Sequence, residues 1–134
     1  MAYTFGARSR AALAYVHPDL RRALDEAIRQ IDFTVICGRR GRAEQLAAYR
    51  AGASKARFGQ SPHNFDPALA IDFIPSPFTG WSDTASFKKV ADTIIAAGAH
   101  VGVTLTPGYT FRNLKDWPHI ELADWKAMRG KLAE

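Results

Sequence analysis

The feature that most constrains this chain is a short segment, Asp-Trp-Pro-His-Ile-Glu at residues 116–121, that places two polar side chains together. Pro118 has no backbone N–H to donate to a neighbouring strand, so it suits the first residue of a strand. Side chains then alternate, which puts His119 and Glu121 on one face and Ile120 on the other. An imidazole and a carboxylate buried side by side would each need a polar partner. The segment therefore predicts a functional site.

The size and charge of the chain limit the classes of protein it can be. We expect one domain over residues 1–134, since that length supports a single core. The chain has 18 Lys and Arg against 13 Asp and Glu, a net charge of +5, which favours an anionic partner such as nucleic acid or an anionic cell wall. The Arg residues are scattered and form no clear basic stripe on a helix, so we expect no nucleic-acid partner.

The composition also bears on the cellular compartment. Cys37 is the only cysteine, which excludes an internal disulfide and argues against a cysteine-based metal site. The first residues lack the long apolar core of a signal peptide, and no stretch is long enough to span a membrane. We therefore expect a soluble protein that stays in the cytoplasm unless another factor releases it, with no membrane partner.

Hydrophobic periodicity predicts an α+β fold in which helices pack on one side of a small, mostly antiparallel sheet. The β-branched and aromatic runs predict strands, and the apolar residues at helical spacing predict helices that end near glycines. A short helical turn is expected within 8–16, and Ser82 or Asp83 is expected to cap the third helix. The predicted helices cover 18–31, 42–51, 84–97 and 124–132, and the predicted strands cover 33–37, 68–74, 100–106 and 118–122.

Three polar residues could form a metal site if neighbouring strands bring them together. His63 lies on a predicted loop, Asp72 is a lone carboxylate in an apolar strand, and His119 lies on another strand. Two imidazoles and one carboxylate bind zinc well and leave a fourth position for water. The alternative is a surface histidine, an aspartate paired with one of the many arginines, and a buried histidine with an ordinary hydrogen-bond partner.

Four short motifs surround these candidate ligands. They are Ser61-Pro62-His63-Asn64-Phe65, Ala70-Ile71-Asp72-Phe73 and Asp116-Trp117-Pro118-His119-Ile120-Glu121, with Gly38-Arg39-Arg40 and Gln45 upstream. Together these motifs resemble the M15 family of zinc peptidases, and the resemblance extends from about residue 17 to residue 122.

The resemblance implies specific roles for the motif residues. It implies zinc held by His63, Asp72 and His119, with Asp116 as the general base and acid. It makes Arg40 the cation that steadies the substrate or the oxyanion.

Other polar residues near these motifs are candidates for supporting roles. We expect Glu121 to orient His119, and Glu121 is also the rival candidate for the general base. Gln45, Ser61 and Trp117 are candidates for holding the loop or lining the groove, and residues 104–111 are expected to line the groove as well. Trp81 and Trp125 are expected to pack in the core or against a helix.

The resemblance also implies a substrate and a biological setting. The family includes phage L-alanyl-D-glutamate endopeptidases, which act as endolysins on peptidoglycan, and D-alanyl-D-alanine carboxypeptidases, whose fold is shared with Hedgehog. Asp116, where the family's dipeptidases tend to carry Glu, favours the phage endopeptidases. By this resemblance the protein is a monomeric, single-domain zinc enzyme without a separate wall-binding domain. It would wait in the host cytoplasm until a holin gives it access to the cell wall or periplasm.

Four other functions remain open at this stage. One is a D-alanyl-D-alanine carboxypeptidase of the same family. Another is a cysteine peptidase that uses Cys37 with His63 or His119, because nearby cations would lower the thiol pKa. A third is an iron oxygenase with the same ligand types, although its His and Asp ligands usually lie almost adjacent on a strand. The last is a wall-binding module without catalysis, which the intact Asp116 argues against.

Overall fold

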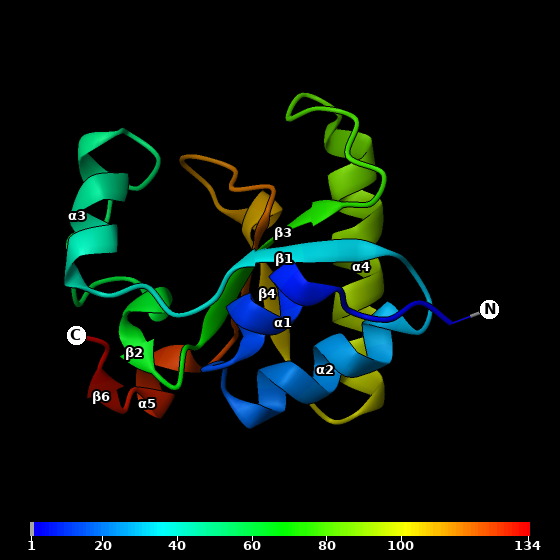
Figure 1. Ribbon diagram of the computed structural model, residues 1–134, viewed down its shortest axis with the longest axis horizontal. Helices are drawn as coiled ribbons and strands as arrows, with labels where there is room; N and C mark the ends of the chain where they lie inside the picture. The colour runs from blue at the N-terminus through cyan, green and yellow to red at the C-terminus, as the bar shows by residue number, and fades with distance from the viewer. Residues whose placement is uncertain (1) are drawn as a thin grey trace.

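A four-stranded antiparallel sheet is the centre of the fold in the computed structural model, which describes residues 2–134 (Figure 1). The strands lie in the order β1-β3-β5-β4, and a separate two-stranded sheet pairs β2 with β6. The strands are β1 (Phe33–Cys37), β2 (Phe65–Asp66), β3 (Ala70–Pro75), β4 (Leu105–Pro107), β5 (His119–Leu122) and β6 (Lys131–Leu132). The helices are α1 (Ala7–Leu13), α2 (Pro18–Ile28), α3 (Arg42–Arg50), α4 (Thr84–His100) and α5 (Trp125–Met128), with single 3₁₀ turns η1 (Pro62–Asn64) and η2 (Gly108–Thr110).

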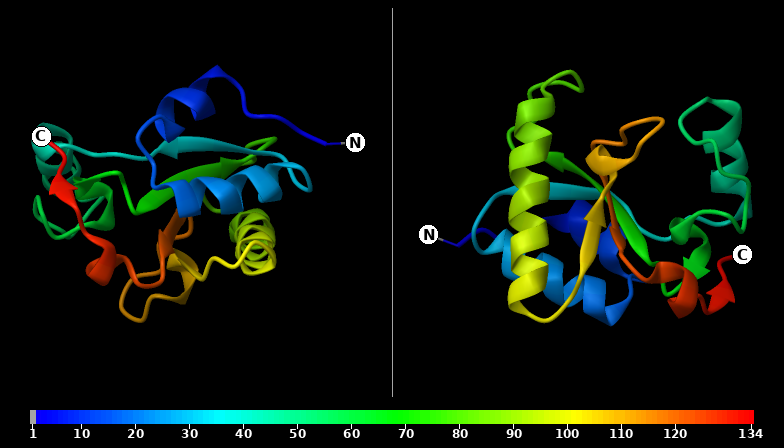
Figure 2. Two further views of the ribbon diagram at one scale, coloured as in Figure 1. Left: turned by 90° about the horizontal axis from the view of Figure 1, so that it is seen from below. Right: turned by 180° about the vertical axis from the view of Figure 1, so that it is seen from behind.

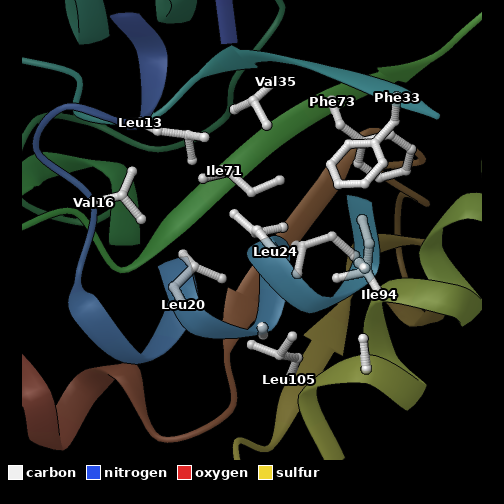
Figure 3. Close-up of a cluster of buried hydrophobic side chains, with 14 of the residues drawn as sticks. Leu13, Val16, Leu20, Leu24, Phe33, Val35, Ile71, Phe73, Ile94 and Leu105 are labelled. Carbon is white, nitrogen blue, oxygen red and sulfur yellow. The ribbon is translucent and has the colours of Figure 1, made fainter. Parts of the chain in front are cut away.

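The hydrophobic core lies between one face of the sheet and the helices α2 and α4. Leu20 and Leu24 of α2 are fully buried and point toward Ile71 and Phe73 of β3, as Figure 3 shows. Ile94 of α4 completes this cluster. Because side chains alternate along a strand, Asp72 lies on the opposite face of β3 from Ile71 and Phe73. The α+β architecture with a small antiparallel sheet is confirmed, and it leaves the second face of the sheet for the site.

Helix α1 covers the outer edge of the sheet instead of a face. β1 is an edge strand, and the hydroxyl of Ser9 in α1 accepts a hydrogen bond from the backbone N–H of Val35 at 3.0 Å. Both groups are buried, so this contact satisfies a donor that would otherwise have no partner strand. A helix in this position also protects the edge from pairing with another chain.

Three connecting segments project from the same side of the molecule, at the top of Figure 1 and of the right-hand view in Figure 2. They are the end of α3 with the loop after it, the loop between β3 and α4, and the loop between η2 and β5. These segments come from distant parts of the sequence. Loops that a rigid scaffold brings together in this way often form binding sites.

Most predicted elements are confirmed, with ends shifted by a few residues. β1 matches its predicted range, and Asp83 caps α4 by accepting a hydrogen bond from the backbone N–H of Ser86. The predicted helix 18–31 ends at Ile28, and the predicted strand 68–74 begins at Ala70. No helix among residues 2–134 is long and apolar enough to cross a membrane.

Two of the secondary-structure predictions in the C-terminal half of the chain are wrong. The strand predicted for 100–106 is mostly not a strand, because α4 continues to His100, a turn follows at 101–102, and only Leu105–Pro107 pairs with β5. Gly102, at φ 78°, occupies the left-handed conformation that follows the helix. The helix predicted for 124–132 stops at Met128, because Lys131 and Leu132 pair with β2 in a contact that the local sequence does not encode.

At Gly98, side-chain packing and helix propensity should change the stability of the protein in opposite directions. A methyl group at this position would lie 2.8 Å from the carbonyl oxygen of Val103 and 2.9 Å from Leu105 Cδ1. Helix propensity alone would make Gly98→Ala stabilising by about 1 kcal/mol, but overpacking of this kind typically costs about 1–3 kcal/mol. We predict that overpacking outweighs the gain in propensity, so that Gly98→Ala lowers the free energy of unfolding, by up to about 2 kcal/mol, in urea denaturation.

Gly130→Ala is the matched control for this prediction. The nearest atom to a methyl group there is the carbonyl oxygen of Asp66 at 3.6 Å, an ordinary contact. Its effect is expected to stay within about 0.5 kcal/mol. A gain in stability for Gly98→Ala would show that α4 and β4 can separate without cost.

Candidate metal centre and catalytic cleft

The pairing of β3 with β5 brings two of the predicted ligands face to face. Asp72 and His119 are direct partners in this antiparallel ladder, so their side chains lie on the same face of the sheet. The distance from Asp72 Oδ1 to His119 Nδ1 is 3.4 Å. This register, set by the two strands, is the reason that residues 47 positions apart meet.

The third predicted ligand, His63, arrives from the 3₁₀ turn η1. Ser61 caps this turn by accepting a hydrogen bond from the backbone N–H of His63 at 3.2 Å. The imidazole is buried, with only 2% of its side chain exposed, and its Nε2 lies 3.3 Å from Asp72 Oδ1. Ser61 therefore positions a candidate ligand through the backbone.

These three side chains have the geometry of an open metal site. One ligand atom from each of His63, Asp72 and His119 can be chosen so that all three lie within 4.8 Å of one another. His63 Nε2 and Asp72 Oδ1 are buried without a hydrogen-bond partner among residues 2–134. Donor atoms bound at about 2.1 Å in a tetrahedral arrangement lie roughly 3.4 Å apart, which matches the 3.3 and 3.4 Å from Asp72 Oδ1 to the two imidazole nitrogens. The residues present therefore fit a zinc-sized cation and leave a fourth position open.

The outer nitrogens of both imidazoles have acceptors that fix which nitrogen carries hydrogen. His63 Nδ1 lies 2.8 Å from the carbonyl oxygen of Gly38, and His119 Nε2 lies 2.7 Å from Glu121 Oε1. From these contacts we assign hydrogen to His63 Nδ1 and His119 Nε2. His63 Nε2 and His119 Nδ1, which face Asp72, are then the nitrogens whose lone pairs a metal ion would take. This is how metal-binding histidines are held in proteins.

The electrostatics of the group agree with its capacity to hold a cation. Burial would lower the pKa of His63, but the Asp72 carboxylate outweighs burial and raises that pKa to about 10. Burial would raise the pKa of Asp72, but the His63 and His119 imidazoles outweigh it and hold the pKa well below its usual range. Without a metal, Asp72 is a carboxylate that draws protons onto the imidazoles. A metal cation would replace those protons.

Asp116 lies beside His63, Asp72 and His119, in the turn that leads into β5. Its Oδ2 is 3.9 Å from His119 Nδ1, and its side chain is 46% exposed. The turn is closed by a hydrogen bond from the His119 N–H to the Asp116 carbonyl, and Gly108 packs against it so closely that a Cβ would lie 2.2 Å from that oxygen. Partial burial raises the pKa of Asp116. The carboxylate is therefore near the ligands without being one of the three.

Arg40 contacts the three candidate ligands, called the metal group below, through the second carboxylate oxygen of Asp72. Its Nη2 donates to Asp72 Oδ2 at 3.3 Å, leaving Asp72 Oδ1 toward the two histidines. Its Nη1 donates to the carbonyl oxygen of the buried Gln45 side chain at 3.1 Å. The sequence predicted a role in substrate or oxyanion binding, and the structure adds a contact with a candidate metal ligand. The Arg40 side chain is 16% exposed and borders the cleft.

Gln45 and Asn64 form a buried network behind Arg40 and His63. Gln45 Nε2 donates to Ser54 Oγ and to the carbonyl oxygen of Ala56, which ties α3 to the loop after it. Asn64 Nδ2 donates to the Gln45 side chain and to the Arg40 carbonyl. Asn64 is fully buried and was not predicted as a site residue, although it directly follows His63 in the quoted motif. The side-chain amides of Gln45 and Asn64 therefore serve to hold Arg40 and the loop after α3 in place.

The metal group lies in a cleft of about 850 Å³ on the open side of the sheet. The cleft is bordered by residues 53–56, residues 60–63 and residues 111–116, so the expected wall at 104–111 begins only at Phe111. Trp117 does not line it, because its ring stacks on Tyr109 at 5.6 Å and packs against the core. Cys37 Sγ lies 3.9 Å from His63 Nδ1, but that nitrogen already has the closer Gly38 carbonyl.

Comparison with known proteins agrees with this geometry. The family described as phage L-alanyl-D-glutamate peptidase matches residues 1–124. Among solved structures, the crystal structure of the Serratia marcescens L-Ala D-Glu endopeptidase ChiX is similar, with 31% sequence identity and a TM-score of 0.77. The match covers 92% of this chain and 92% of that one. No curated protein matches the sequence. Because the family match spans most of its length, the chain belongs to the phage L-alanyl-D-glutamate peptidase family.

Proposed function

We propose that this protein is a zinc-dependent peptidoglycan peptidase that cleaves the bond between L-alanine and D-glutamate in the stem peptide. The observation that carries the proposal is the group formed by His63, Asp72 and His119, in which two donor atoms are buried and have no hydrogen-bond partner in the described part of the chain. Family membership and the similarity to an L-Ala D-Glu endopeptidase support the choice of bond. A metal ion bound here would polarise the scissile carbonyl and lower the pKa of an attacking water.

Asp116 is the proposed general base and acid. It takes a proton from the attacking water as oxygen adds to the carbonyl carbon, and it gives that proton to the leaving amine as the C–N bond breaks. Its pKa, raised by burial, brings the carboxylate closer to the operating pH than an exposed aspartate would be. The rival base, Glu121, is held by His119 Nε2 at 2.7 Å on the side away from Asp72, which favours an orienting role.

Arg40 is proposed to act on both the metal group and the substrate. Its contact with Asp72 Oδ2 holds that carboxylate in place, and a guanidinium has further N–H donors available. The stem peptide carries carboxylates, and the tetrahedral intermediate carries an oxyanion. A fixed cation at the edge of the cleft stabilises either one. Ser61 and Gln45 support His63 and Arg40, and Trp117 is proposed to brace the turn that holds Asp116.

The biological setting follows from the family and is part of the proposal. Phage peptidases of this kind act as endolysins, so the enzyme would be made in the host cytoplasm and reach the wall when a holin opens the membrane. Residues 1–134 are proposed to act as one monomeric peptidase domain. Peptidoglycan is the partner, and its negative charge suits a chain with a net charge of +5.

Digestion of purified peptidoglycan tests the proposed reaction. The zinc-loaded protein is expected to release stem peptides that lack L-alanine, as identified by mass spectrometry, because the cleaved bond lies after that residue. A strong chelator should stop release, and added zinc should restore it. Loss of only a terminal D-alanine would instead place the enzyme with the carboxypeptidases. If the zinc-loaded protein releases nothing, a wall-binding module becomes the better explanation.

Substitution of the two acids separates catalysis from metal binding. Asp116→Asn is expected to lower kcat by about 10²- to 10⁴-fold while zinc affinity stays near that of the unmodified protein. Glu121→Gln is expected to weaken zinc affinity by about 10- to 100-fold, with much of the activity regained in excess zinc. Asp124→Asn, at an exposed acid without a side-chain cap bond, is the control. Full turnover by Asp116→Asn would assign the base elsewhere.

The pH dependence of metal binding tests the electrostatics of the site. The pKa of His63 is raised to about 10 in the metal-free protein, so near neutral pH its imidazole carries a proton that zinc must displace. Apparent zinc affinity should therefore rise with pH, by about tenfold per unit for each proton displaced. Calorimetry between about pH 6 and pH 8 in buffers of different ionisation enthalpy measures the protons released. An affinity independent of pH would contradict the assignment.

A further inference from the structure

A second feature of the cleft is an exposed aromatic pair at one of its borders. Trp81, in the loop between β3 and α4, is 59% exposed, and the neighbouring Phe78 is 44% exposed. Their rings meet edge to face with centroids 5.2 Å apart. The sequence predicted Trp81 as a core or helix-packing residue; its ring does pack on a helix, through Phe87 of α4, but it lies outside the core. Two large aromatic side chains together on a protein surface commonly mark a binding site.

The indole of Trp81 is held in a fixed orientation. One of its faces stacks on Phe87 of α4, with ring centroids 5.7 Å apart and an interplanar angle of 18°. Phe87 is fully buried and in turn contacts Phe73 of β3, with centroids 5.8 Å apart. The core thus supports the indole from below while more than half of its surface stays in solvent. A surface already ordered before binding loses little conformational entropy when a ligand arrives.

Trp81 belongs to the same cleft as the metal group. It borders the cavity that also contains His63, Asp72 and His119. The loop that carries it projects on the same side of the sheet as the other two cleft loops (Figures 1 and 2). A substrate that reaches the metal group and extends along the cleft toward this loop would therefore meet the aromatic surface.

We propose that Trp81, flanked by Phe78, is a subsite that binds a sugar ring of the glycan strand. The inference rests on the proposed function. In peptidoglycan the L-alanine amine is joined to the lactyl group of a muramyl sugar, so the sugar lies one residue from the proposed scissile bond. Sugar rings present an apolar face of C–H groups, which packs on an aromatic ring, while their hydroxyls remain in water. The subsite would select stem peptides still attached to glycan.

Two substrates that share the scissile bond test this subsite. One is a disaccharide-linked stem peptide, and the other is the same peptide carrying only the lactyl group. The unmodified enzyme is expected to prefer the sugar-bearing substrate. Trp81→Ala is expected to raise KM for that substrate by about tenfold or more, the effect of losing roughly 1.4 kcal/mol of binding, and to leave the lactyl peptide nearly unchanged.

Two further variants control the interpretation. Trp81→Tyr, which keeps an aromatic face, should regain part of the preference. Tyr3→Ala, at an exposed aromatic residue that does not line the cleft, should change neither substrate. An equal loss on both substrates would assign Trp81 a structural role, and no loss on either would remove the subsite; each result overturns the proposal. If the unmodified enzyme cuts neither substrate, the proposed function itself fails.

Discussion

The structure depends on one pairing, that of Asp72 in β3 with His119 in β5 across an antiparallel ladder. The Asp72 carboxylate lies on the opposite face of β3 from the hydrophobic core, and its Oδ1 faces His63 and His119 at 3.3 and 3.4 Å. A buried carboxylate is costly unless opposite charges surround it. Here Arg40 takes one oxygen and the histidines face the other. Such a group stabilises a cation better than it stabilises the fold, which is the arrangement expected of a metal site.

Most residues around this pairing hold the candidate ligands in place and have no direct part in the proposed reaction. Gly38 and Glu121 hold the outer nitrogens of the two imidazoles, and Ser61 holds the turn that carries His63. The buried amide of Gln45 connects Arg40 to the loop after α3, so one wall of the cleft is tied to the metal group. The site is therefore ordered before substrate arrives, which lowers the entropic cost of binding and reaction.

Much of this arrangement could be predicted from the sequence. Strand alternation placed His119 and Glu121 on one face, and the motifs brought His63, Asp72 and Asp116 into one hypothesis. Their exact contacts could not be predicted, because they depend on the register between strands distant in sequence. The same reason explains the missed pairing of Lys131 and Leu132 with β2. The large exposure of Trp81 could not be predicted either, since composition does not reveal which aromatic residues a fold leaves exposed.

The central claim is that His63, Asp72 and His119 hold one zinc ion through Nε2, a carboxylate oxygen and Nδ1. A crystal structure of the zinc-loaded protein, with anomalous data collected at the zinc absorption edge, tests it most directly. The account predicts one zinc ion per chain, with these three protein ligands at about 2.0–2.2 Å and a fourth position open to solvent. Zinc bound at other residues, or this cluster left without metal under zinc saturation, would contradict it.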